Sequence, residues 1–215
     1  MQTANETTCD LLRDAARWLL LAKLFECPSE RWRRELAALA DESDDAKLQD
    51  AARAALASAT EGDYHSVFGP GGPAPPREVS YCESVELGSL MSELGAYYHA
   101  FGYQPVVSEP PDHVAVEIGF LAYLRLKQAH ATHSGRSDNA EIARQAAERF
   151  RADHLATVAP QLASLLAASG IDYLAQASAR LAARAASPRP RTFLPVVDNP
   201  EADDDGSEFP CCSAL

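Results

Sequence analysis

Apolar side chains recur at three- and four-residue steps along most of the chain, a pattern typical of helices that bury one face. In the first such segment, Leu11, Ala15, Trp18, Ala22 and Phe25 form one apolar stripe. No segment of useful length alternates between apolar and polar residues as a half-buried strand would, so the pattern predicts an all-α fold. The predicted helices cover about residues 10–26, 30–40, 44–60, 84–101, 113–131, 138–153, 160–168 and 172–186.

Two proline-rich segments interrupt this pattern. Residues 62–81 contain four prolines and four glycines, and because proline lacks a backbone donor, we expect an ordered loop there with one helical turn around residues 64–68. Residues 103–113 read YQPVVSEPPDH and form a second non-helical segment. Asp112 is placed to cap the helix that follows it.

These breaks suggest how the chain is organised. We expect one helical domain over residues 1–186, with an N-terminal lobe to about residue 102, a Pro-rich hinge at 103–113 and a C-terminal lobe at 114–186. From Val196 onward the chain contains six acids and no Lys or Arg. Residues 187–215 lie beyond the last predicted helix. They are predicted to form a flexible, disordered acidic tail.

The charge of the chain limits its partners. With 31 acids against 19 Lys and Arg, the net charge is −12. Such a protein gains nothing from displacing the counterions of DNA or RNA, so we expect no nucleic-acid partner. The apolar content of 47% is sufficient for a sizeable core.

The cysteines and the first residues indicate the compartment. The five cysteines are odd in number and irregularly spaced, as is typical of reduced thiols. The opening residues MQTANETTCD lack the basic and apolar regions of a signal peptide, and the longest apolar stretch, residues 18–25, is too short to span a bilayer. We therefore expect a cytoplasmic protein without membrane insertion.

The most distinctive polar cluster is Glu109-Pro110-Pro111-Asp112-His113. Two prolines hold this segment extended just before a predicted helix, whose free N–H groups suit an anionic group. The spacing alone favours a structural role, in which Asp112 caps the helix and His113 hydrogen-bonds across the hinge.

An enzyme and a metal protein are alternatives. Asp112-His113 suggests a helical metal-dependent phosphohydrolase, but such enzymes use the order His-Asp with further ligands on neighbouring helices. His130 and His133 lie three residues apart without a clear second pair, and adjacent Cys211-Cys212 suit zinc poorly. We expect no catalytic residues, no metal site and no cofactor. A generic helical scaffold or interaction protein remains a further alternative.

Two motifs decide among these alternatives. EPPDH follows YYHAFG and runs into VAVEIGFLAYL, while FGPGGPAPPREVSY lies upstream. Together they resemble the E-P-x-D-H and F-x-G-P…P-P…S-x-Y segments of the TorD/DmsD/NarJ family of redox-enzyme maturation chaperones. The resemblance implies an all-α chaperone without catalysis that binds a molybdopterin-dependent oxidoreductase. Its client would be the catalytic subunit, held through its N-terminal signal-like peptide and apoprotein until the cofactor is inserted.

The resemblance also implies which residues bind the client peptide. Those of the hinge motif would be Glu109, Pro110, Asp112 and His113. Those of the upstream loop would be Tyr64, Phe68, Pro76 and Tyr81. The chain departs from the pattern at Arg77-Glu78, where many relatives have an aromatic residue. A hinge between two lobes is compatible with a monomer or a domain-swapped dimer.

Overall fold

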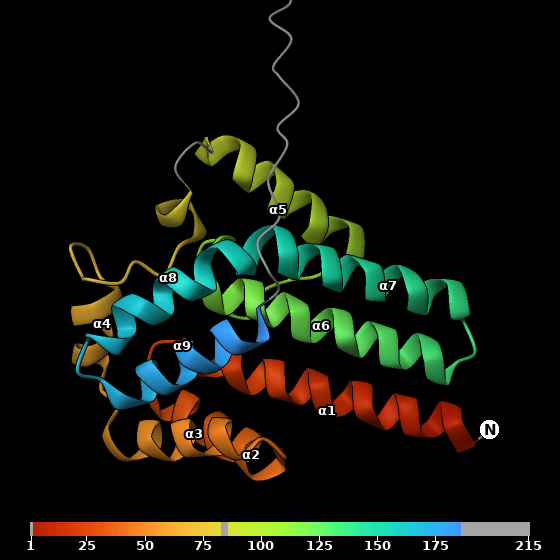
Figure 1. The fold of residues 1–215 in the computed structure, drawn as a ribbon, viewed down its shortest axis with the longest axis horizontal. Helices are drawn as coiled ribbons and strands as arrows, with labels where there is room; N and C mark the ends of the chain where they lie inside the picture. Colours follow the sequence, from red (N-terminus) through yellow and green to blue (C-terminus); the bar gives the residue numbers. More distant parts are fainter. Residues whose placement is uncertain (1, 83–85, 186–215) are drawn as a thin grey trace, which may run out of the picture.

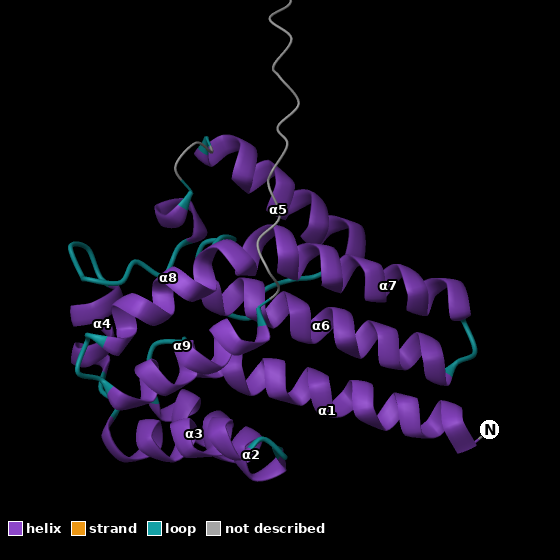
Figure 2. Ribbon diagram, viewed as in Figure 1, coloured by secondary structure: helices purple, strands orange, loops and turns teal. Residues whose placement is uncertain are grey.

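The structure, a computed structural model, describes residues 2–82 and 86–185. The described residues are mostly helical and contain no strand, which confirms the all-α prediction (Figure 2). The helices are α1 (Gln2–Leu24), α2 (Glu30–Glu42), α3 (Ala46–Ser58), α4 (Glu61–Phe68), α5 (Leu87–Phe101), α6 (Val114–His133), α7 (Ser137–Phe150), α8 (Ala156–Ala167) and α9 (Asp172–Arg184), with the short elements η1 (Glu78–Tyr81) and η2 (Arg151–Leu155).

The helices form stacked layers (Figure 1). Helix α6 packs along α1 on one side and along α7 on the other, and it runs opposite in direction to both. Helices α2 and α3 lie beside α1, α9 packs against α3 and α8, and α5 lies across the side of α7. The first and sixth helices, far apart in sequence, are therefore direct neighbours.

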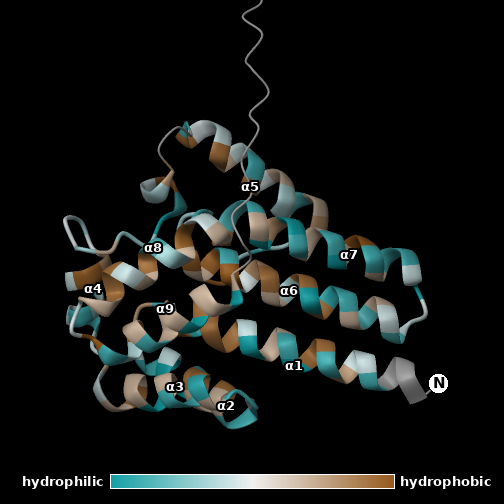
Figure 3. Ribbon diagram, viewed as in Figure 1, coloured by the Kyte–Doolittle hydropathy of each residue, from teal (hydrophilic) through white to brown (hydrophobic). Residues whose placement is uncertain are grey.

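One hydrophobic core runs through these layers. Fully buried side chains from separate helices belong to it, including Leu20, Phe25, Phe120, Phe150 and Leu174. Polar and apolar residues alternate along α1 and α7 in Figure 3, as expected for amphipathic helices. The core therefore includes residues on both sides of the segment 103–113.

Several helix ends follow the predicted signals. The Ser29 hydroxyl accepts a hydrogen bond from the Trp32 N–H at 3.1 Å and caps α2. Gly102 ends α5 with a φ of 66°, a left-handed conformation that glycine adopts without steric cost.

Two predicted boundaries were wrong. Helix α1 begins at Gln2 and not near residue 10. Residues 61–68 form the two-turn helix α4, where a loop with one turn was expected. The prolines and glycines of the segment follow Phe68, so they end α4 without preventing it, and the Thr60 hydroxyl caps its start by accepting from Asp63 N–H at 3.0 Å.

The path from α7 to α8 also differs from the prediction. The helical path continues through η2, a π-helical segment, into α8, and Pro160 lies inside α8. Because Pro160 is close to the start of α8, its missing N–H removes one early hydrogen bond without ending the helix. The sequence predicted a new helix beginning at Pro160.

Two predictions lie outside the described residues: the helix start at residue 84 and the acidic tail at 187–215. Over the described ranges, no helix has the length and apolarity needed to cross a membrane. The division into lobes at residues 103–113 stays a prediction.

Candidate functional site

The two proline-rich segments meet side by side in space. Arg77 and His113 form an isolated antiparallel bridge. The Glu78 N–H donates to the Asp112 carbonyl at 2.8 Å, and the Val114 N–H donates to the Pro76 carbonyl at 2.8 Å. We call this pairing of residues 76–78 with residues 111–114 the motif junction.

An ion pair closes the motif junction. The Arg77 Nε donates to the Asp112 Oδ1 at 2.8 Å, and the Asp112 side chain is fully buried. The other carboxylate oxygen, Oδ2, has no hydrogen-bond partner among the described residues. Because Asp112 turns toward Arg77, it does not cap α6 as predicted.

His113 caps α6 instead. Its Nδ1 accepts a hydrogen bond from the Ala115 N–H at 3.2 Å, and its Nε2 lies 3.3 Å from the Tyr64 hydroxyl. A nitrogen that accepts carries no proton, so the neutral ring has its proton on Nε2 and donates it to Tyr64. Burial, and secondly the charge of Arg77, lower the pKa of His113 to about 4.

Tyrosine hydroxyls hold both segments in place. The Tyr81 hydroxyl donates to the Pro75 carbonyl at 2.6 Å, and the Tyr98 hydroxyl from α5 donates to the Pro111 carbonyl at 2.8 Å. Burial raises the pKa of Tyr81 to about 12. These hydroxyls therefore stay protonated and act as donors.

The Phe68 ring packs edge-on against Tyr64, with ring centroids 4.9 Å apart.

All eight residues predicted from the motifs lie at or near the motif junction, but they differ in exposure. Five of them are buried, each with an exposed fraction between 0 and 9%: Tyr64, Phe68, Tyr81, Asp112 and His113. Pro76, Glu109 and Pro110 are half-buried and reach the surface. Whether any of them binds a peptide stays a prediction.

A buried pair adjoining the motif junction was not predicted. The Glu78 Oε2 lies 2.9 Å from His154 Nδ1, and both side chains are fully buried. Glu78 and Arg77 are the residues at which the chain departs from the motif pattern, and both point to charged or polar partners inside the protein. No sequence signal connects residue 78 with residue 154.

An apolar groove runs beside the motif junction between α1 and α6. It has a volume of about 360 Å³ and is lined in part by the segment that precedes Glu109. Leu19, Val106 and Leu126 are 40, 89 and 43% exposed, respectively. We call the surface lined by Leu19, Glu26, Val106, Val107, Gly119 and Leu126 the α1–α6 groove.

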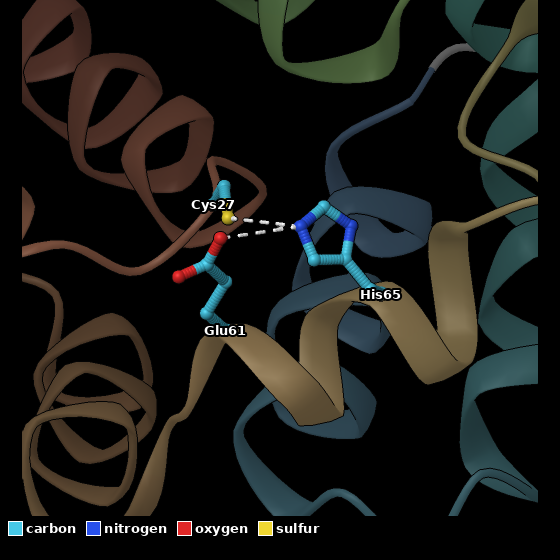
Figure 4. Close-up of side chains that lie close together, drawn as sticks. All are labelled: Cys27, Glu61 and His65. Carbon is cyan, nitrogen blue, oxygen red and sulfur yellow. Dashed lines mark hydrogen bonds and ion pairs between the residues drawn. The ribbon is translucent and has the colours of Figure 1, made fainter.

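A cluster of possible metal ligands was also missed. Cys27, just after α1, lies against Glu61 and His65 of α4 (Figure 4). Glu61 and His65 are four residues apart, and only a helix at this position brings them to one face. The predicted loop concealed this spacing, and the approach of Cys27 depends on tertiary structure.

The arrangement does not favour a phosphohydrolase at Asp112 and His113. Asp112 is paired with Arg77, and both nitrogens of His113 are engaged by Ala115 and Tyr64. Neither residue belongs to a group of three potential metal ligands among the described residues.

Comparison with known proteins assigns the family. No curated protein matches the chain. The family model for the nitrate reductase delta subunit matches residues 32–164, which is more than half of the 215 residues and includes both motif segments. This family, of the NarJ/TorD type, consists of chaperones for molybdoenzyme maturation and not of catalytic enzymes. The chain, with its two motif segments paired in an all-α fold, belongs to the nitrate reductase delta subunit family.

Proposed function

We propose that this protein is a cytoplasmic chaperone that binds the N-terminal signal-like peptide and the apoprotein of a molybdopterin-dependent oxidoreductase catalytic subunit. It holds the subunit while the cofactor is inserted and assembly proceeds, before release or export. The observation that carries the peptide-binding part is the α1–α6 groove, an apolar groove lined in part by a segment that leads directly into Glu109.

The groove fits the apolar part of such a peptide. A signal-like peptide contains an apolar run, and exposed apolar side chains in a concave surface gain free energy when a partner covers them. Val106 is 89% exposed although it is a large aliphatic residue. Burial of its side chain, with those of Leu19 and Leu126, is the main gain expected on binding.

Glu109 fits the basic part of the peptide. It lies three residues after Val106, so the two residues are at most about 10 Å apart along the chain. Among the ion pairs of the described residues, no Lys or Arg pairs with Glu109. An arginine next to the apolar run of the peptide would therefore meet an uncompensated carboxylate.

The other motif residues have a positioning role in this proposal. Tyr64, Phe68, Tyr81, Asp112 and His113 are buried and hold the motif junction together, whereas Pro76, Glu109 and Pro110 lie where a peptide can reach them. The motif residues would thus set the position of the segment that lines the α1–α6 groove.

Capture from the native host tests the client. Tagged protein is expected to recover a molybdopterin-dependent oxidoreductase catalytic subunit, identified by mass spectrometry. Val106→Asp should weaken binding about tenfold or more, about 1.4 kcal/mol, because a carboxylate would enter the apolar interface.

The matched control for this experiment is Ile142→Asp. Ile142 is 57% exposed and lines a separate apolar groove between α5 and α7, so the control should capture the client normally. Equal capture of the client by Val106→Asp and Ile142→Asp would show that the α1–α6 groove does not bind it. Recovery of no molybdoenzyme would contradict the proposed function itself.

Salt dependence tests Glu109. With a labelled peptide from the recovered subunit, Glu109→Lys should weaken binding at low salt, and the difference from wild type should shrink as salt screens the charges. Glu42→Lys, at an exposed position on α2, makes the same charge change elsewhere. A loss that is the same for both variants, or none for Glu109→Lys, would show that Glu109 does not contact the peptide.

A further inference from the structure

Three side chains of different chemistry converge at the end of α1. The Cys27 Sγ lies 4.0 Å from the His65 Nε2, and the Glu61 Oε1 lies 3.6 Å from the same nitrogen. All three ligand atoms lie within 4.8 Å of one another (Figure 4). The three side chains point toward one common space.

These separations approach those of a tetrahedral metal site. Zinc bonds of about 2.3 Å to sulfur and about 2.0–2.2 Å to nitrogen or oxygen place neighbouring ligand atoms roughly 3.4–3.6 Å apart. The observed 3.6 Å between Glu61 and His65 lies in this range, and the 4.0 Å between Cys27 and His65 is a few tenths of an ångström longer. Small side-chain rotations would close the remaining gap.

The ligand types select the ion. A thiolate, an imidazole and a carboxylate together suit Zn²⁺, whereas Mg²⁺ and Ca²⁺ prefer oxygen ligands alone. Three protein ligands leave the fourth position of a tetrahedron for water or a ligand atom from another molecule.

Two of the three ligands have close neighbours in the fold. The His65 ring packs edge-on against Tyr64, at 5.5 Å between ring centroids and an interplanar angle of 81°. Cys27 is held between the end of α1 and the Ser29 cap of α2. The local charge is negative: after burial, Glu61 and Glu109 are the causes that raise the pKa of the Cys27 thiol. A cation would reverse this unfavourable clustering of acids.

We propose that Cys27, Glu61 and His65 bind a zinc ion, with its fourth position open. On binding, the Cys27 thiol loses its proton to solvent, and the thiolate, the His65 Nε2 and a Glu61 oxygen form bonds to the metal. The ion would link the end of α1 to α4, the helix that carries Tyr64. This site does not depend on the client proposed above.

Cobalt titration of the full-length chain tests the site. The background protein has Cys9, Cys82, Cys211 and Cys212 replaced by serine, so that Cys27 is the only thiol. Added Co²⁺ should give the visible bands of a tetrahedral ion and a near-ultraviolet thiolate-to-cobalt charge-transfer band. Zn²⁺ should then remove both.

Variants in the same background identify the ligands. Cys27→Ser should abolish the charge-transfer band, and His65→Gln and Glu61→Gln should each weaken metal binding by at least about tenfold. Zinc should raise the thermal midpoint of the background protein and not that of Cys27→Ser. His130→Gln, at an exposed position near the end of α6, serves as the matched control.

Circular dichroism reports whether each variant folds, so loss of a metal ligand can be distinguished from loss of the fold. Glu61 is largely exposed, with 72% of its side chain accessible, so Glu61→Gln keeps the test valid if another variant unfolds. Absence of the charge-transfer band in the folded background protein would overturn the site. So would equal metal affinity in Glu61→Gln and His130→Gln.

Discussion

At the scale of single residues, neighbouring side chains in the upstream motif have separate buried partners. Arg77 pairs with Asp112 beside it, while Glu78 turns to His154 from η2. Asp112, Glu78 and His154 are fully buried, and a buried polar side chain that loses a partner keeps its desolvation cost, so such a loss is more costly than that of a surface ion pair. Arg77 therefore ties the loop to the start of α6, and Glu78 ties it to the path between α7 and α8.

His113 should make stability depend on pH. Its pKa is about 4 in the folded protein and 6.5 ordinarily. As pH falls from about 6.5 to about 4, the unfolded chain binds a proton that the folded chain excludes, so the free energy of unfolding falls by about 3 kcal/mol from this residue. Urea unfolding across this range should show a shallower fall for His113→Gln.

The control for the pH experiment is His133→Gln, at an exposed position at the end of α6. It should follow the wild-type pH profile. A wild-type profile in His113→Gln as well would mean that His113 is not held neutral in the folded protein.

The residues of the candidate site were accessible from the sequence, but their partners were not. Proline spacing and the EPPDH string identify residues 109–113, because these features are local. The contacts of Arg77 with Asp112 and of Glu78 with His154 join residues 35 and 76 positions apart. Such pairings depend on how the helices pack, which apolar periodicity does not specify.

At the scale of elements, helices with strong apolar stripes were predicted well. Helices α2, α5 and α9 follow stripes and end signals that the sequence displays. Helix α6 was also predicted, although its consecutive buried residues 114–118 lie all round the helix and not along one stripe. Helix α4 was missed because the prolines and glycines after Phe68 dominate the composition of its surroundings. The π-helical η2 was missed because one additional residue per turn leaves no distinct pattern in a short segment.

Helix α6 comes close to the segment 103–107, which lines the α1–α6 groove. A Cβ atom at Gly119 would lie 2.7 Å from the Tyr103 hydroxyl, and this hydroxyl donates to the Val116 carbonyl at 3.3 Å. Alanine favours the helix by about 1 kcal/mol over glycine, whereas the displaced hydrogen bond is worth about 0.5–1.5 kcal/mol. Gly119→Ala should therefore change the free energy of unfolding by less than about 1 kcal/mol.

A double-mutant cycle separates these opposing effects. Tyr103→Phe removes the hydroxyl, so Gly119→Ala in that background should stabilise the protein by about 1 kcal/mol. Hydrogen exchange at residues 103–107 should be faster in Gly119→Ala than in wild type. It should be no faster in the double variant than in Tyr103→Phe alone. The same energetic effect of Gly119→Ala in both backgrounds would exclude the contact with Tyr103.

At the scale of the whole molecule, Asp14 joins three helices that are distant in sequence. Its carboxylate lies 3.1 Å from Arg125 of α6 and 2.6 Å from Arg184 of α9. The Arg184 guanidinium also lies over the Trp18 ring, 4.2 Å from its centroid. This network holds α6 and α9 against α1.

Asp14→Ala should destabilise the folded protein by about 2–3 kcal/mol. It leaves two arginines without this partner, and their side chains are only 14 and 13% exposed. Asp10→Ala breaks the exposed pair with Arg13 and should change stability by less than about 1 kcal/mol. Urea unfolding measures both, and similar losses for the two variants would contradict a central role for Asp14.

The motif junction has a consequence for how two copies of this chain would associate. It pairs residues on either side of α5, so two chains that exchanged their parts from residue 111 onward would re-form the same pairing between molecules, together with the packing of α1 against α6. Monomer and exchanged dimer would then share nearly all their contacts, and interconversion would require these contacts to break. Exchange would be as slow as unfolding. The oligomeric state of a preparation would therefore record the protein concentration at which the chains folded, and later dilution would change it only slowly.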